Sequence, residues 1–243
     1  MTGVQTCALP IFFFEVPVYL LIFFGLVRAA VRRRREPGRA AWYPSVSCVV
    51  TCYNEGMDVQ KTIRSLCMQL YPGSIQLVVI VDGADLNWRT YDAARAMREF
   101  VASRHNRSLL VVPKWQRGGR VSSLNTGLQF ATGTIVMALD GDTSFDNNMV
   151  ERSTRHFQDP SVVCVAGSLR VRNTWASVVT RMQAIEYFLS IHATKTGLSE
   201  FNLVNNISGA FGIFRRTILD LIAGWDAGDR KSTRLNSSHT NLS

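Results

Sequence analysis

The sequence contains few of the residues that build disulfide-rich domains. It has five cysteines in 243 residues, and no Cys-x-x-Cys pair or Cys/His cluster occurs among them. Cys48 and Cys52 share one face of a short Val-rich stretch. Buried, reduced thiols in a cytosolic domain are therefore the simplest interpretation of the cysteines.

The sequence also lacks the glycine pattern of dinucleotide-binding oxidoreductases and an evenly spread basic charge. No Gly-x-Gly-x-x-Gly follows the first apolar strand pattern, which argues against a Rossmann-type oxidoreductase. The formal net charge is +9, but the arginines within residues 28–39 and the basic residues near the C-terminus supply most of it. The high isoelectric point therefore does not indicate a nucleic-acid surface.

Long apolar runs are scarce, and the longest candidate is short for a membrane-spanning helix, which needs about 20 residues. This candidate, Phe12–Val27, is interrupted by one acidic residue and one proline. Arg28 and the run Arg32–Arg35 follow at once, a placement typical of the cytoplasmic side of a membrane helix. We therefore expect a transmembrane helix over residues 12–31 and a basic linker over residues 32–44, with the following domain on the cytoplasmic side of the cytoplasmic membrane. A buried core helix is the alternative.

Both ends of the chain differ in character from the rest. Residues 1–11 and 228–243 contain stretches that resemble conceptual translations of a sequencing adapter. We interpret both as adapter-derived and expect the natural sequence to begin near Phe12 and to be cut off near Ala227. Ordinary polar termini are the alternative.

Short apolar runs alternate with helical patterns from residue 45 onward. Helices of 10–15 residues between strands are typical of a parallel, doubly wound sheet. The expected strands are Ser47–Thr51, Leu77–Val81, Leu109–Val112, Ile135–Leu139 and Val162–Ala166. The expected helices are Val59–Leu70, Thr90–Ser103, Val121–Ala131, Asn147–Phe157 and Ser177–Thr194. We therefore predict an α/β domain with a doubly wound, mostly parallel sheet over residues 45–227.

The stretch with the clearest chemistry is the strand that ends in Asp140-Gly141-Asp142. Ligands of open α/β sheets bind outside the carboxyl ends of the strands. Gly141 lets the backbone turn, so that both carboxylates can face one point. Two carboxylates together with substrate phosphates suit Mg²⁺ or Mn²⁺. An acidic turn that caps the next helix is the alternative.

Two further acidic residues follow other strands of the predicted sheet. Glu55 lies in the loop after the first strand, and Asp82 directly follows the second. The carboxyl ends of parallel strands meet at one edge of a sheet. We therefore predict that Glu55, Asp82 and Asp140 lie on the same edge.

Several stretches of the chain occur in an order that resembles a known family. They are Val50-Thr-Cys-Tyr-Asn-Glu55, Val81-Asp-Gly83, Arg117-Gly-Gly-Arg-Val-Ser-Ser-Leu-Asn125, Ala138-Leu-Asp-Gly-Asp-Thr143, Gln183-Ala-Ile-Glu-Tyr187, Ser208-Gly-Ala210, Phe214-Arg-Arg216 and Gly224-Trp-Asp226. Over residues 44–226 the chain is similar to family 2 glycosyltransferases, especially the membrane polysaccharide synthases related to cellulose, hyaluronan and poly-N-acetylglucosamine synthases. The resemblance implies a nucleotide-diphospho-sugar transferase fold of the GT-A-like type.

The resemblance also implies the donor site. A nucleotide sugar, usually UDP-linked, would be the donor, and Mg or Mn the cofactor. The implied donor-binding residues are Thr51, Tyr53, Glu55, Asp82, Arg117, Arg120 and Asp140, and the implied metal ligands are Asp140 and Asp142. The first-strand loop and Asp82 would hold the nucleoside, and one of the two arginines would neutralise the diphosphate. Gly118 and Gly119 would let phosphate approach the backbone at a helix N-terminus.

Further implications concern the acceptor and the reaction. Ser208, Gly209 and Gln183 match acceptor-side positions of the family, whose members extend a polysaccharide or glycosylate a membrane-held acceptor with inversion. The family's catalytic base is an Asp in a Thr-Glu-Asp-like motif beyond the position of Asp226, so we expect this fragment to bind donor without turnover. A non-catalytic nucleotide-binding membrane module is the alternative.

The chain departs from the family pattern at several donor-side positions, among them Arg117 and Arg120, where lysine is frequent. A single acid, Asp82, follows the second strand where the family commonly has two. Gly141 stands where alanine is frequent, a difference that the resemblance implies is harmless.

Overall fold

The chain folds into two compact units. The computed structural model describes residues 13, 15–33, 42–168, 170, 177–204, 207 and 211–226. The sheet unit takes its described residues from 40–167 and 207–240, and the helical unit takes its described residues from 1–39 and 168–206.

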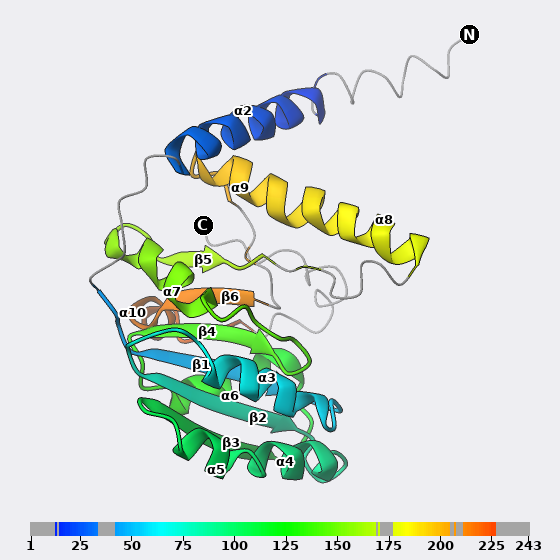
Figure 1. Cartoon of the computed structure of the whole chain (residues 1–243), viewed down its shortest axis with the longest axis vertical. Coiled ribbons are helices and arrows are strands. Elements are labelled where there is room, and N and C mark those ends of the chain that lie inside the picture. The colour runs from blue at the N-terminus through cyan, green and yellow to red at the C-terminus, as the bar shows by residue number, and fades with distance from the viewer. Residues whose placement is uncertain are drawn as a thin grey trace. The chain divides into compact units, whose positions relative to one another are not determined.

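Within the residues that the structure describes, six strands form one mixed sheet in the order β3-β2-β1-β4-β6-β5 (Figure 1). The strands are β1 (Val46–Cys52), β2 (Ile75–Asp82), β3 (Arg107–Lys114), β4 (Ile135–Asp140), β5 (Cys164–Ala166) and β6 (Phe211–Arg215). β3, β2, β1 and β4 are parallel neighbours. β6 runs antiparallel to β4, and β5 runs antiparallel to β6. The predicted α/β sheet is therefore confirmed, and it is parallel over these first four strands.

The four parallel strands lie where the apolar runs predicted them. Strands that are covered on both faces form continuous apolar runs instead of alternating patterns, and every residue of β1 is buried. Val49 of β1, Val78 and Ile80 of β2 and Leu124 share one core cluster. Burying one such aliphatic side chain contributes about 1.5–3 kcal/mol.

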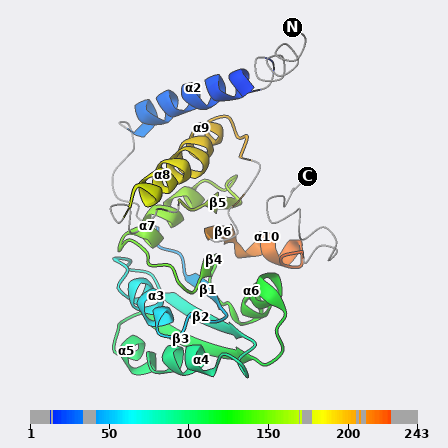
Figure 2. The same ribbon diagram turned by 90° about the vertical axis from the view of Figure 1, so that its right-hand side faces the viewer.

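Helices cover both faces of the parallel strands. The helices of the sheet unit are α3 (Asp58–Cys67), α4 (Trp88–Arg95), α5 (Arg98–Ala102), α6 (Gly119–Phe130), α7 (Met149–Thr154), a 3-10 helix (Arg155–Gln158) and α10 (Arg216–Leu221). Figures 1 and 2 show α6 on one face of the sheet and α3 and α5 on the other. The continuous helix predicted over Thr90–Ser103 is instead divided into α4 and α5.

The last two strands differ from the prediction. The strand expected over Val162–Ala166 is the short β5, and it pairs with β6, which the apolar pattern did not reveal. β6 has five residues and leads directly into α10. A run this short does not distinguish a strand from the start of a helix.

The helical unit contains two helices that cross very closely. Its helices are α2 (Val16–Arg33), α8 (Val178–Tyr187), a π-helix (Phe188–Ala193) and α9 (Thr194–Ser199). A Cβ on Gly25 of α2 would meet the backbone of Gly197 of α9 inside 3.0 Å, and a Cβ on Gly197 would meet the backbone of Ile22. Glu200, just after α9, lies 2.7 Å from Arg32 and 3.5 Å from Arg28 of α2. Glycines at the crossing and ion pairs at its end therefore hold α2 against α9.

Across the part of the chain that the structure describes, no helix is both long and apolar enough to cross a membrane. α2 is the longest candidate, but its C-terminal end contains Arg28, Arg32 and Arg33. The transmembrane helix expected over residues 12–31 is therefore not found among these residues.

Candidate functional site

Acidic residues gather at one edge of the parallel strands. Asp82 and Asp140 are the last residues of β2 and β4, and Thr51 near the end of β1 is the register partner of Asp140. Glu55 lies in the loop that follows β1. The prediction that Glu55, Asp82 and Asp140 share one edge is confirmed, because β1, β2 and β4 are parallel.

Hydrogen bonds to the backbone of β1 and to a side chain of α3 hold the backbone of the Asp140-Gly141-Asp142 turn. The N–H of Gly141 donates to the carbonyl of Thr51 at 3.0 Å. The buried hydroxyl of Thr62 lies 2.8 Å from the carbonyl oxygens of both Gly141 and Thr143. These bonds use the backbone of the turn, so the carboxylate of Asp142 remains exposed at the surface.

Gly141 is not interchangeable with alanine in this chain. A Cβ at position 141 would come inside 3.0 Å of Cys52 Sγ and would stand 3.1 Å from the carbonyl oxygen of Thr51. Cys52 is 2% exposed, so its sulfur has little room to retreat. The expectation that glycine here is harmless is not contradicted, because in this chain the β1 cysteine occupies the space that an alanine methyl group would need.

The loop after β1 is held by its own acid. The N–H of Tyr53 donates to Glu55 Oε2 at 2.6 Å. Burial raises the pKa of the Glu55 carboxyl, and the charge of Asp142 adds to this rise, although the N–H groups of Glu55 and Tyr53 oppose it. Glu55 is therefore close enough to the acidic turn for the charge of Asp142 to disfavour its ionised form.

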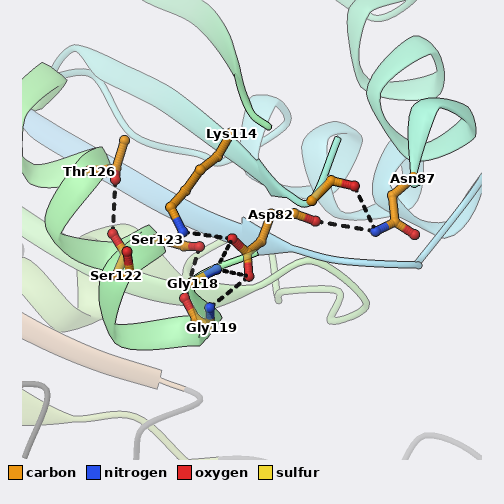
Figure 3. A network of polar contacts seen from close by, with 9 residues as sticks. Asp82, Asn87, Lys114, Gly118, Gly119, Ser122, Ser123 and Thr126 are labelled. Carbon is orange, nitrogen blue, oxygen red and sulfur yellow. Dashed lines mark hydrogen bonds and ion pairs between the residues drawn. The ribbon is translucent and has the colours of Figure 1, made fainter. Parts of the chain in front are cut away.

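Asp82 is the centre of a buried polar network (Figure 3). Its carboxylate accepts hydrogen bonds from Lys114 Nζ at 2.8 Å, from the N–H of Gly118 at 2.9 Å and from the N–H of Gly119 at 2.8 Å. Burial alone would raise the pKa of Asp82, but Lys114 and the two N–H groups outweigh it and lower the pKa. Asn87 donates to the carbonyl oxygens of Asp82 and Gly83 and fixes the backbone of the same turn.

The two arginines of the predicted site have different partners. Arg117 lies over the ring of Tyr53, with its Cζ 4.2 Å from the ring centroid. Arg120 forms an ion pair with Asp140, and burial lowers its pKa while the charge of Asp142 opposes this change. Arg117 thus lies beside the β1 loop, and Arg120 beside the acidic turn.

Asn125 ties α6 to the Gly224-Trp225-Asp226 segment. Its amide accepts from the N–H of Trp225 and donates to the carbonyl of Trp225, both at 2.8 Å. Gly224 has φ +89°, and a Cβ there would meet the Asn125 amide oxygen. Two motifs that lie a hundred positions apart in the sequence therefore form one structural unit.

The acceptor-side residues of the sequence analysis are not part of this arrangement as described. Ser208 and Gly209 lie outside the described residues. Gln183 is exposed on α8 of the helical unit. Their expected role stays a prediction.

Three residues of the site have no equivalent in the sequence predictions. Lys114 donates to the carboxylate of Asp82, and Thr62 donates to the backbone of the acidic turn. Cys52 fills the space that a side chain at Gly141 would need. Lys114 ends the third parallel strand, so the strand-end argument that identified Asp82 and Asp140 could have identified it as well. Nothing in the local pattern around Cys52 or Thr62 indicates these contacts.

The donor set at the edge suits a hard divalent cation that is shared with a substrate. Among the described residues, no group of three or more His, Cys, Asp and Glu side chains is placed to hold a metal by itself. Asp140 and Asp142 offer carboxylate oxygens from one turn, and Mg²⁺ and Mn²⁺ are commonly bound by one or two carboxylates plus phosphate oxygens. The residues therefore fit a metal that the donor diphosphate completes.

A mixed α/β sheet whose four parallel strands carry acids and arginines at their carboxyl edge defines the class of the protein as a doubly wound α/β protein, a class that binds its ligands at this edge. The chain belongs to glycosyl transferase family 2, whose family model matches residues 47–222. The membership confirms the resemblance that the ordered motifs carried.

Curated relatives agree with this membership, and a solved structure supports the fold. The poly-β-1,6-N-acetyl-D-glucosamine synthase of Staphylococcus epidermidis is 31% identical over 182 residues, which cover 74% of this chain and 42% of the relative. The enzyme of the same name from Staphylococcus aureus strain COL is 28% identical over the same length and shares. The chain thus spans less than half the length of these relatives. A mannosyltransferase of Pyrobaculum calidifontis, solved with GDP-Man and Mn²⁺, has a TM-score of 0.58 at 21% identity, covering 88% of this chain and 57% of its own, and supports the fold.

Proposed function

We propose that the chain carries the donor-binding part of an inverting, metal-dependent glycosyltransferase that uses a UDP-sugar. The observation that carries the proposal is the Asp140-Gly141-Asp142 turn at the carboxyl edge, with Arg120 paired to its first acid. A nucleotide sugar needs positive charge for its diphosphate and hydrogen-bond partners for its nucleoside. The carboxyl edge of the sheet supplies the positive charge through Arg120 and the hydrogen-bond partners through the loop after β1.

The nucleoside would lie against the loop after β1. Thr51, Tyr53 and Glu55 come from this strand end, and Arg117 lies over the Tyr53 ring. A half-buried carboxylate such as that of Glu55 suits a ribose hydroxyl, which can donate to it. The planar guanidinium of Arg117 can stack on the face of a flat base.

The diphosphate would lie at the acidic turn. Asp142 and Asp140 would hold Mg²⁺ or Mn²⁺, which supplies charge stabilisation for a departing diphosphate when bound. Arg120 stands beside Asp140 and can add a bidentate contact to phosphate. Because Arg120 is partly buried, its charge is less screened than that of a fully exposed arginine.

The acceptor hydroxyl needs a base, which typically contributes about 10²–10⁴-fold to the rate. The carboxylate of Asp82 already accepts hydrogen bonds from Lys114, Gly118 and Gly119. Asp140 is paired with Arg120, and Asp142 is assigned to the metal. We therefore assign the base to none of these three acids. The family resemblance places it in a Thr-Glu-Asp-like motif beyond the position of Asp226.

The acceptor would be a growing polysaccharide or another membrane-held chain. The names of the staphylococcal relatives support a polysaccharide product. A location at the cytoplasmic membrane, with the sheet unit on the cytoplasmic side, is part of the proposal and rests on the basic run that follows the apolar residues 12–27 in the sequence.

Titration calorimetry with UDP tests the proposal. We expect UDP to bind in the presence of Mn²⁺ or Mg²⁺ and to bind at least about tenfold more weakly without metal or in Asp142→Ala, which is a loss of about 1.4 kcal/mol. Asp146→Ala removes an exposed acid four positions further on and should leave UDP affinity unchanged. Equal UDP affinity with and without metal would reject the metal-dependent donor site.

A transfer assay tests the assignment of the base. We expect no sugar transfer to an acceptor by this chain, although it binds the donor. Sugar transfer by this chain that survives Asp226→Asn would show that the base is another residue of this chain and would overturn the assignment.

A further inference from the structure

The loop between β4 and α7 takes its hydrogen-bond partners from another element. Residues 141–148, all of them described, form no helix or strand, and they include Asp142. Backbone N–H and C=O groups that are shielded from water need partners, and a loop that pairs with no strand must find them elsewhere. Side chains from one face of α3 and from the residues just after it supply such partners.

Three polar residues make up this face of α3. Thr62, Ser65 and Gln69 follow one another at the spacing that places helical side chains on the same side. Thr62 and Ser65 lie on α3, and Gln69 lies two positions beyond its last residue. Thr62 is fully buried and Gln69 is 4% exposed, so both side chains bond to the protein where water has little access. We call these three residues the α3 polar face.

The hydroxyl of Thr62 serves both sides of Asp142. It lies 2.8 Å from the carbonyl oxygen of Gly141 and 2.8 Å from that of Thr143, the residues before and after this acid. The carboxylate of Asp142 is exposed, and the hydroxyl of Thr143 donates to it at 3.3 Å. One buried hydroxyl therefore fixes the backbone that directs this carboxylate and leaves the carboxylate itself at the surface.

Ser65 and Gln69 continue this support along the loop. The N–H of Phe145 donates to Ser65 Oγ at 3.2 Å. The side-chain amide of Gln69 donates to the carbonyl of Asp146 at 2.8 Å and accepts from the N–H of Val150 at 3.0 Å. Val150 lies in the first turn of α7, so Gln69 joins the far end of the loop to the α3 polar face.

We propose that Thr62, with Ser65 and Gln69 behind it, is a positioning residue that holds Asp142 in place for a divalent cation. The proposal rests on the donor site proposed above and names the residue on which its metal dependence relies. Thr62 acts through the backbone of the acidic turn and contacts neither metal nor nucleotide. A metal ligand has to be held within about 0.5 Å of its productive position, and a buried hydroxyl that serves both neighbours of Asp142 restrains the turn more than solvent can.

Replacing the hydroxyl by a methyl group tests this role. Thr62→Val keeps the shape of the side chain and leaves the carbonyl oxygens of Gly141 and Thr143 without this donor. In titration calorimetry with UDP, we expect it to raise the Mn²⁺ concentration that gives half-maximal UDP binding by at least about fivefold, since changes in the partners of metal ligands typically cost about 10–100-fold in metal affinity. Thr62→Ser keeps the hydroxyl and should restore the Mn²⁺ requirement of the wild type.

UDP affinity without metal separates positioning from a general loosening of the fold. Asp142 is assigned to the cation, so Thr62→Val should change UDP affinity in EDTA by less than about twofold. Equal weakening with and without Mn²⁺ would mean that Thr62 only maintains the fold, and it would overturn the proposal. An unchanged Mn²⁺ requirement would overturn it as well.

Thr154→Val is the matched control. Thr154 is 1% exposed, and its hydroxyl donates to the carbonyl of Val150 in its own helix at 2.9 Å. Its replacement removes an equally buried hydroxyl that has no contact with the acidic turn, so the Mn²⁺ requirement should not change. A shift as large as that of Thr62→Val would overturn the proposal.

A double-mutant cycle with Asp142 tests the route of the effect. If Thr62 acts through Asp142, then Thr62→Val should weaken UDP binding at saturating Mn²⁺ by less than about twofold in the Asp142→Ala background. Full additivity of the two losses would show that Thr62 acts by another route and would overturn the proposal.

Ser65→Ala provides the same test if Thr62→Val does not fold. It removes the acceptor of the Phe145 N–H and should raise the Mn²⁺ requirement at least about twofold with UDP affinity in EDTA unchanged. If UDP binding by the wild type does not depend on metal, the proposed donor site fails and this role fails with it. If the wild type shows the metal dependence and neither variant alters it, only the role of the α3 polar face is refuted.

Discussion

Replacing Gly141 by alanine puts a methyl group where Cys52 Sγ already lies. The new Cβ would stand inside 3.0 Å of the sulfur, whereas packed carbon atoms stay about 3.5–4.0 Å apart. The sulfur would have to move by about 1 Å in a close-packed interior, since Cys52 is 2% exposed. Overpacking of this kind typically costs about 1–3 kcal/mol. We expect Gly141→Ala to lower the free energy of unfolding by that amount.

Removing the sulfur should restore the lost stability. Cys52→Ala deletes one buried heavy atom and should cost about 0.5–1.5 kcal/mol by itself. In the double variant the alanine methyl group occupies the space that the sulfur left. The double variant should therefore be about 1–2 kcal/mol more stable than the sum of the two single changes predicts.

Urea unfolding followed by circular dichroism measures these differences, with the slope of the transition checked for constancy. Cys48→Ala is the matched control, because Cys48 is also fully buried in β1 but lies away from the turn. It should give no rescue of Gly141→Ala. A Gly141→Ala chain as stable as the wild type, or equally destabilised with and without the Cys52 sulfur, would refute the packing argument.

Three further changes probe other parts of the molecule. The pKa of Asp82 is lowered in the folded state, so its contribution to stability is fully present above the unfolded value of about 3.9 and is lost as the pH falls through the folded value. The urea midpoint should therefore fall less between pH 5 and pH 3 in Asp82→Asn than in the wild type; an equal fall would contradict this. Asn125→Ala removes both bonds to Trp225 and should cost about 1–3 kcal/mol in urea unfolding, with Asn125→Asp in between because it keeps the acceptor; equal losses for the two would contradict this role. Gly197→Leu should separate α2 from α9 and speed tryptic cleavage after the α2 arginines, whereas the exposed Ser199→Leu should not; unchanged cleavage in the first variant would show that the crossing is not tight.

The sequence predicts the acidic edge because the information is local. β1, β2 and β4 are mostly apolar, and each acid stands at or just beyond a strand end. Parallel strands bring such ends together whatever the lengths of the helices between them. Asp82 and Asp140 can therefore be placed on one edge from their own neighbourhoods.

The partners of these acids depend on contacts between distant segments. Thr62 reaches Gly141 across 79 positions, and Lys114 reaches Asp82 across 32. Whether a carboxylate faces solvent or is enclosed by N–H groups depends on where a second loop returns. The pattern around Asp82 is compatible with both, so its enclosure by the N–H groups of Gly118 and Gly119 could not be read from the chain. β6 escaped prediction for a similar reason, since its identity as a strand comes from pairing with β4.

The two antiparallel strands make residues 168–206, one part of the helical unit, an excursion of the chain between β5 and β6. β5 ends at Ala166, β6 begins at Phe211, and Ala166 is the register partner of Gly212. The chain therefore leaves the sheet and returns to it at adjacent positions, as it does in a hairpin. Closing such an excursion costs only about 0.6 kcal/mol more for each doubling of its length. The length of residues 168–206 can thus change at small cost in closure free energy to the sheet, so the acidic edge tolerates insertions of different length between the same two strands.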